Sequence, residues 1–299
     1  MFEEAQLYSP VTKGDDGRVM VHLGQDHPGF NDPDYRARRN EIAGASMDWR
    51  PGDPVPQIDY TEAEQRVWRT VCAELPAKHA RYACRAYRDA VAALDLPRDQ
   101  IPQLGEVSAR LGGLTGWSYA PAPGLVPLRE FLASLGERSF HSTQYVRHSA
   151  EPLYTPEPDL IHEVIGHANT LADPSFAHVN EQAGLAAQRV STEPALQFLA
   201  DVFWFTMEFG VLYEEGELRA YGAGILSSYG EIEEFRAMEI RPLDFLEMGT
   251  IDYDITKYQK LLFAAESFAH MVETVGGFFA DFDDDTPARL RAGAGVAAA

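Results

Sequence analysis

The sequence has few cysteines, few basic residues and no long apolar run. Its two cysteines, Cys72 and Cys84, are too few for a disulfide framework or a cysteine-rich zinc site, so we expect buried thiols in a reducing compartment. Lys and Arg number 25 against 46 Asp and Glu, which gives a formal net charge of −21. This charge repels phosphate backbones and anionic lipids, which disfavours nucleic-acid and membrane partners.

No apolar segment approaches the roughly 18 residues that a membrane helix requires. The N-terminus also lacks the basic start and apolar stretch of a signal peptide. We therefore expect a cytoplasmic protein. At 299 residues, 45% of them hydrophobic, the chain is long enough to bury a large core without disulfides.

The chain is expected to form one mainly α-helical domain with a few short β-strands, over residues 27–280. Residues 1–26 show little periodicity and are expected to be a flexible arm. Residues 281–299, an acidic run followed by Gly and Ala, are expected to be a disordered tail.

Hydrophobic spacing and cap residues predict most of the secondary structure. The capping box Thr61–Glu64 opens one helix, and Pro194 opens a long apolar one with Ser191 or Thr192 as its cap. A strand is expected over 139–146 and a turn at 112–113. The predicted helices lie at about 35–45, 61–75, 79–95, 128–136, 159–172, 181–189, 194–213 and 257–275.

Two histidines within one apolar helix indicate a metal site. His162 and His167 are five residues apart, unlike the zinc-protease pattern, in which the histidines are four apart and lie above one another. On an ideal α-helix, residues five apart point about 140° away from each other. Both can reach one metal only if the helix ends or bulges, and Gly166 permits that distortion.

A third ligand is expected from Glu208, the one acid in the middle of the apolar helix at 194–213. A carboxylate there is costly unless it is paired or bound to metal. His162, His167 and Glu208 would form a set of two histidines and one carboxylate, which suits non-heme Fe(II) and oxygen chemistry. The alternative is that the histidines are structural and that Glu208 forms a salt bridge.

Six segments resemble the pterin-dependent aromatic amino acid hydroxylases, most of all the short bacterial phenylalanine 4-monooxygenases. The resemblance runs from about His27 to about His270. The segments are DHPGFNDPDYRARR at 26–39, IPQLGEVS at 101–108, FHSTQYVRH at 140–148, YTPEPDLIHEVIGH at 154–167, FWFTMEFG at 203–210 and YGAGILSSYGE at 221–231.

The resemblance implies that Fe(II) and a tetrahydropterin together activate O2, so that one oxygen atom goes to the pterin and the other to the aromatic ring of an amino acid. It assigns His162, His167 and Glu208 to the iron. It also implies that Glu163, between the two histidines, faces the pterin and supports oxygen activation without binding the metal. The remaining pterin contacts it implies are Val126, Phe131, Leu132 and Ala200.

An arginine clamp is expected for the carboxylate of the substrate, because a guanidinium binds a carboxylate through two hydrogen bonds. The resemblance implies that Arg147 is this clamp, with Asp159 orienting it. Thr155 and Ser227 would supply hydroxyl groups. The substrate ring would lie among His141, Pro158, Trp204, Phe209 and Gly224.

Trp204 and His141 match phenylalanine hydroxylases, and Ile255 is apolar where the tyrosine enzymes carry an acid. The expected reaction is therefore the conversion of L-phenylalanine to L-tyrosine. Hydroxylation at carbon 3 or of tryptophan, a zinc hydrolase, and a non-catalytic binding protein are the alternatives. Phe203 departs from the tyrosine usual in phenylalanine hydroxylases. Because the chain has no room for the regulatory and tetramerisation segments of the animal enzymes, a monomer is expected.

Overall fold

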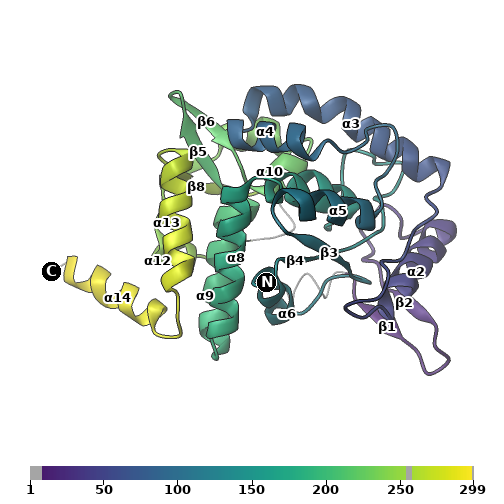
Figure 1. The fold of residues 1–299 in the computed structure, drawn as a ribbon, viewed down its shortest axis with the longest axis horizontal. Helices are drawn as coiled ribbons and strands as arrows, with labels where there is room; N and C mark the ends of the chain where they lie inside the picture. The colour runs from purple at the N-terminus through teal and green to yellow at the C-terminus, as the bar shows by residue number, and fades with distance from the viewer. Residues whose placement is uncertain (1–8, 254–257, 298–299) are drawn as a thin grey trace.

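Helices dominate the computed structural model, which describes residues 9–253 and 258–297 (Figure 1). The α-helices are α2 (Pro33–Met47), α3 (Glu62–Tyr82), α4 (Arg85–Leu94), α5 (Leu104–Leu114), α6 (Leu128–Leu135), α7 (Asn169–Leu171), α8 (Pro174–Arg189), α9 (Glu193–Phe203), α10 (Ala223–Ser227), α11 (Glu231–Glu234), α12 (Phe245–Met248), α13 (Phe268–Asp281) and α14 (Thr286–Ala297). The π-helices are η1 (His162–Ala168) and η2 (Trp204–Glu208), and η3 (Phe235–Ala237) is a 3₁₀ turn. The mainly helical fold class is as the sequence predicts.

The strands are short and form three small sheets. They are β1 (Val11–Lys13), β2 (Val19–Val21), β3 (Ser118–Pro121), β4 (Ser139–Ser142), β5 (Val211–Glu214), β6 (Glu217–Ala220), β7 (Glu239–Pro242) and β8 (Leu261–Ala265). β1 and β2 form a hairpin. β3 and β4 pair in parallel, and α6 connects them along the chain. The largest sheet has the order β6-β5-β8-β7.

Several predicted helices are found with shifted ends. α3 begins with the expected capping box, in which the Thr61 hydroxyl accepts from the Glu64 amide. The helix predicted over 79–95 is split, because the backbone at Ala83 and Cys84 is extended and the Cys84 amide donates to the Ala220 oxygen at 2.9 Å. The turn predicted at 112–113 lies inside α5.

Two predicted segments have a different secondary structure. The helix expected over 194–213 becomes π-helical at Trp204 and ends at Glu208, and β5 follows. The helix expected over 257–275 is instead β8 followed by α13. β8 is an apolar run in the interior of its sheet, and periodicity alone does not separate such a strand from a buried helix.

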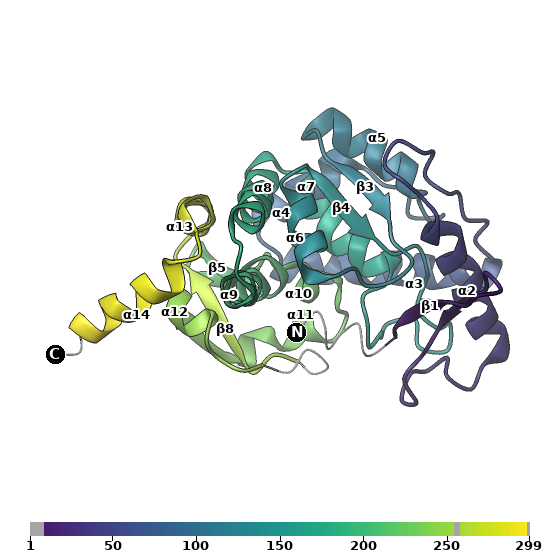
Figure 2. The same ribbon diagram turned by 90° about the horizontal axis from the view of Figure 1, so that it is seen from below.

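Both ends of the described chain are more ordered than the sequence predicts. In the expected arm, β1 and β2 pack on α2 and bury Val21 and Leu23. In the expected disordered tail, Phe282 is fully buried and α14 extends from the body (Figure 2). The acidic run has a structural role, because the Asp284 carboxylate accepts hydrogen bonds from the amides and hydroxyls of Ser191 and Thr192 at the start of α9.

The core is built around α8 and α9, which lie between α13 and the β3–α6–β4 unit (Figure 1). α8 packs against both α6 and α13. Gly184 of α8 permits the closest approach, since a Cβ there would lie 1.9 Å from the amide nitrogen of Gly136. η1 continues through α7 toward α8, and six of the seven residues of this predicted metal helix are buried.

Candidate active site

The segment with the two predicted histidine ligands is a π-helix. Residues five apart are hydrogen-bonded neighbours in a π-helix, so the i, i+5 spacing that points apart in an α-helix places both side chains on one face. Gly166 permits the π-helical backbone and also lets η1 pack closely on α10, because a Cβ there would lie 2.8 Å from the Ala223 oxygen of α10. The bulge expected from the sequence is therefore present as η1.

Glu208, at the end of the second π-helix, meets the two histidines. The Nε2 atoms of His162 and His167 are 3.1 Å apart. Glu208 Oε1 lies 3.1 Å from His167 Nε2, and Oε2 lies 3.7 Å from His162 Nε2. Three ligand atoms at right angles around an ion, each about 2.1 Å from it, are about 3.0 Å from one another. The donor set and its spacing therefore fit one metal ion bound on one face.

Burial and neighbouring charges set the protonation of this group. Burial, and then the nearby His167, lower the pKa of His162 to about 4, so its ring is neutral and able to bind a metal at pH 7. Burial raises the pKa of Glu208, but the two histidines outweigh burial and the pKa is lowered overall. Glu208 is therefore ionised.

Glu163 also lies near the histidines, with a carboxylate oxygen within 4.8 Å of their nitrogens. Burial, and then the charges of Glu208 and Asp159, hold the pKa of Glu163 well above its usual range. A neutral carboxylic acid is a poorer ligand than an ionised one. Glu208 is thus the better third ligand, and Glu163 is a buried acid beside the site.

Ser227 contacts the first histidine. Its Oγ lies 2.8 Å from His162 Nδ1 and donates its own proton to the Ala223 oxygen at 2.8 Å. The Nδ1–H group must therefore be the donor to Ser227, which leaves the lone pair on Nε2, the atom that faces Glu208. The family resemblance implied a role with the substrate for Ser227, whereas here its hydroxyl group orients His162.

Arg147 and Asp159 form a buried bidentate pair. Arg147 Nη2 donates to Asp159 Oδ1 at 2.7 Å, and Nε donates to Oδ2 at 2.9 Å. Asp159 also accepts from the His162 amide at the start of η1. Arg147 Nη1 makes no hydrogen bond within the described residues, so one edge of the guanidinium is left for a ligand. The hydroxyl group of Thr155, which the resemblance assigns to the substrate, donates to the backbone oxygen of Glu157.

Aromatic side chains surround Trp204, which is half-buried at the start of η2. Its ring lies 4.5 Å from Phe209 and is stacked on Tyr253 at 5.2 Å. Gly224 packs closely here, because a Cβ would lie 2.7 Å from Phe209 Cζ. Trp204, Phe209 and Gly224 are therefore together as expected. Pro158 lies three residues from Thr155, and its oxygen accepts from the Tyr145 hydroxyl.

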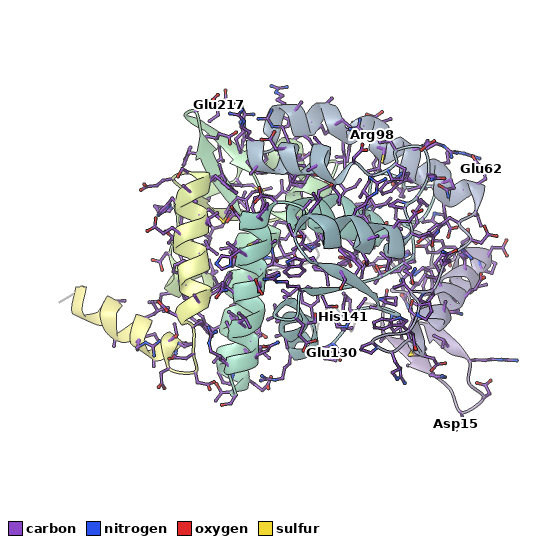
Figure 3. The ribbon with its side chains drawn as sticks, in the orientation of Figure 1. Asp15, Glu62, Arg98, Glu130, His141 and Glu217 are labelled. Carbon is purple, nitrogen blue, oxygen red and sulfur yellow. The ribbon has the colours of Figure 1, made fainter. Side chains whose placement is uncertain are left out.

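The predicted pterin residues lie along α6, α9 and the segment before α6. Phe131 and Leu132 are buried on α6, Ala200 is buried on α9, and Val126 precedes α6. The Phe131 ring meets Phe140 edge-on at 5.4 Å. His141 is half-buried on β4 beside α6, and its Nδ1 lies 3.1 Å from Ser134 Oγ. Figure 3 labels the position of His141.

Sequence reasoning missed three residues of this region. Phe140 lies 4.5 Å from the ring of His167 and connects it to Phe131. The Tyr119 hydroxyl donates to the backbone carbonyl oxygen of Glu163 at 2.8 Å. Tyr253 stacks on Trp204. Only Phe140 lay within a recognised motif, and no spacing rule could connect the other two to the site. Ile255 lies outside the described residues.

Comparison with known proteins identifies the family. Residues 17–289 match the model for the biopterin-dependent aromatic amino acid hydroxylases. The chain belongs to this family. Phenylalanine 3-hydroxylase of Streptomyces coeruleorubidus is 48% identical over 267 residues, which cover 89% of this chain and 96% of that enzyme. Human phenylalanine-4-hydroxylase is 40% identical over 87% of this chain, which spans 59% of the human enzyme.

Solved structures of bacterial phenylalanine hydroxylases share the fold of this hydroxylase. The apo structure from Colwellia psychrerythraea 34H gives a TM-score of 0.73 at 32% identity, over 83% of this chain and 94% of that one. The Chromobacterium violaceum enzyme with iron(III) and 7,8-dihydrobiopterin gives 0.68 at 27%, over 74% and 82%. In the described part of this hydroxylase, no helix is both long and apolar enough to cross a membrane.

Proposed function

We propose that this hydroxylase binds Fe(II) through His162, His167 and Glu208. The support is the mutual spacing of their donor atoms, the ionised carboxylate and the orientation of His162 by Ser227. The related Chromobacterium violaceum structure holds iron. With a tetrahydropterin, the bound metal supplies the activation of O2, and three protein ligands on one face leave the other positions open.

The substrate proposed is L-phenylalanine, held by its carboxylate at the free edge of Arg147. Asp159 fixes the guanidinium by occupying its Nε and Nη2 edge and so limits its rotation. Because Asp159 also binds the first amide of η1, the clamp and the metal ligands are held at a set distance. The ring is proposed to lie against Trp204, Phe209, Pro158, His141 and Gly224, with Thr155 near the carboxylate.

The pterin is proposed to stack on Phe131, with backbone contacts from Val126, Leu132 and Ala200. Phe140 packs against the proposed pterin residue Phe131 and against the ring of His167, and so helps to hold both in place. Glu163 is proposed to act as a neutral acid at the pterin edge, where it holds a proton that the reaction can use. Its raised pKa supports that role.

We propose carbon 3 of the ring as the position hydroxylated. The supporting observation is that the 3-hydroxylase of Streptomyces coeruleorubidus shares 48% identity with this chain over 96% of its own length. Carbon 4, which the motifs predicted, is the second candidate, because the human 4-hydroxylase retains 40% identity. Separation of meta-tyrosine from para-tyrosine after incubation with Fe(II), a tetrahydropterin, O2 and phenylalanine distinguishes the two.

A zinc hydrolase and a non-catalytic binding protein are less well supported. The family match and the π-helical ligand spacing both disfavour a zinc hydrolase. The complete metal set and the buried Arg147–Asp159 pair disfavour a non-catalytic binding protein. A monomeric state and a cytoplasmic location stay predictions, and size-exclusion chromatography with light scattering would test the first.

A further inference from the structure

A cavity of about 280 Å³ lies between α3, α4 and the side of η1 that carries no predicted metal ligand. Its walls are mainly apolar and include Trp68, Leu75 and Val91, while Val164 and Ile165 come from η1. None of the residues assigned above to iron, amino acid or pterin lines it. Since an apolar cavity of about 150 Å³ binds benzene, this one has room for an aromatic ring with a short chain.

One hydrogen-bond acceptor on a residue that lines the cavity has no partner among the residues that the structure describes. His79 lines the cavity and is buried, and its Nε2 lies 2.7 Å from the Leu226 oxygen. Because a carbonyl only accepts, Nε2 must carry the proton and Nδ1 the lone pair. It is this Nδ1 that makes no hydrogen bond. Burial lowers the pKa of His79 to about 4, so this ring stays neutral at pH 7.

The exposed side of the cavity carries a cationic side chain, Arg98. Arg98 lines the cavity and is exposed, and among the described residues its guanidinium has neither an ion pair nor a hydrogen bond. It is close enough to His79 for its charge to lower the pKa of that residue further. Asp95 also lines the rim, with its carboxylate 3.9 Å from Arg110. Figure 3 shows Arg98 beside α3, well apart from His141.

We propose that this cavity is a second ligand site, which takes a small aromatic carboxylate with a hydrogen-bond donor on its ring. The ring lies between the apolar walls, the donor reaches His79 Nδ1, and the carboxylate lies at Arg98. A polar acceptor, apolar walls and a cation are the groups that a hydroxyphenyl alkanoate would need for its hydroxyl group, its ring and its carboxylate. Val164 and Ile165 form the floor, so an occupant also contacts the helix that carries His162 and His167.

The test is calorimetric titration of the full-length, Fe(II)-loaded protein with 3-(4-hydroxyphenyl)propionate and with 3-phenylpropionate, which lacks the donor. We expect saturable binding of the first and about tenfold weaker binding of the second, the loss of one hydrogen bond. Arg98→Gln should weaken both about tenfold. The matched control Arg66→Gln, an exposed arginine of α3 that does not line the cavity, should leave both unchanged.

Two further variants locate the binding. His79→Phe should bring the hydroxylated probe down to the affinity of 3-phenylpropionate. Ala80→Phe, at an exposed position that lines the cavity, should abolish binding of both probes by filling the space. Absence of saturable binding at millimolar concentration would overturn the proposal. So would equal affinity in the wild type, Arg98→Gln and His79→Phe, since the probe would then occupy another site.

Discussion

His162 and His167 are five residues apart, and their Nε2 atoms lie 3.1 Å from each other because the segment between them is π-helical. An α-helix over the same residues would direct the two rings about 140° apart. The predicted metal site therefore requires the π-helix. Its close packing on α10 at Gly166 offers a way to disturb it without altering a ligand.

Replacement of Gly166 by Ala should lower both stability and iron content. The new Cβ would lie 2.8 Å from the Ala223 oxygen, so η1 or α10 must shift. We expect a loss of about 1–3 kcal/mol, typical of overpacking. Gly277→Ala is the matched control, because that exposed helical glycine has open space around its Cβ position. It should keep its iron and gain up to about 1 kcal/mol. Calorimetry measures the stability of the two variants and metal analysis their iron content. Equal iron content in the two variants would show that the packing of η1 on α10 at Gly166 does not support the metal site.

Ser227→Ala should weaken iron binding about 10- to 100-fold, the usual effect of losing a partner that orients a ligand. The hydroxyl group it removes accepts from His162 Nδ1. Ser134→Ala removes a comparable serine contact, with His141, outside the metal site, and should leave iron affinity unchanged. Competition with a chelator gives the affinities. If Ser227→Ala instead raised only the KM for phenylalanine, the substrate role implied by the family resemblance would be preferred.

Arg147→Lys should raise the KM for phenylalanine about 10- to 100-fold, with iron content unchanged. A lysine cannot keep both bonds to Asp159 and still offer a free edge to a carboxylate, and a charge-assisted hydrogen bond contributes about 1.5–3 kcal/mol. Arg138→Lys, at an exposed bidentate pair with Glu181, is the control and should have no effect on KM. Steady-state kinetics decides, and an unchanged KM in Arg147→Lys would exclude the clamp.

Glu163→Gln should separate pterin oxidation from ring hydroxylation while iron stays bound. Glutamine resembles the neutral acid in shape but cannot release the proton that the raised pKa keeps on Glu163. We expect less hydroxylated product per tetrahydropterin oxidised than in the wild type. Parallel measurement of both products gives this ratio, and an unaltered ratio would remove Glu163 from the proposed reaction.

His79 should make stability fall as the pH is lowered from about 6.5 to 4. Burial lowers the pKa of His79 to about 4 in the folded protein, against about 6.5 when unfolded. In this range the unfolded chain binds the proton first, so acid favours unfolding, and above pH 6.5 the contribution is fully present. His79→Gln should lose less stability across this interval, by up to about 3 kcal/mol. Denaturant titrations across this pH range test it, and parallel pH profiles would contradict it.

The sequence predicted the family and the local helix distortion of this protein better than its long-range contacts. The histidine spacing and Gly166 predicted a distorted helix, because helix geometry is local. By contrast, Ser227 is 65 residues from His162, and only the packing of α10 on η1 brings them together. The sequence predicts helix at β8, because a short apolar run does not distinguish a buried strand from a buried helix and the place of β8 in its sheet depends on distant strands.

The ends of the chain show the same limit. The acidic run near residue 284 has the composition of a disordered tail, yet Asp284 accepts hydrogen bonds from the amides of Ser191 and Thr192, just before α9. Thr192, one of the two residues predicted as the cap, is the N-cap of α9, but its hydroxyl group donates to Asp284 and does not accept from a helix amide. Composition does not reveal such a partner 92 residues away.

The most direct test of the central claim is product analysis with the wild-type protein. Fe(II)-loaded enzyme would be incubated with a tetrahydropterin, O2 and equimolar phenylalanine, tyrosine and tryptophan, and the hydroxylated products separated by chromatography with mass detection. We predict pterin-dependent hydroxylation of phenylalanine, with meta-tyrosine as the main product. Para-tyrosine would keep the site and correct the position, whereas 5-hydroxytryptophan as the main product, or no hydroxylated amino acid at all, would contradict the account.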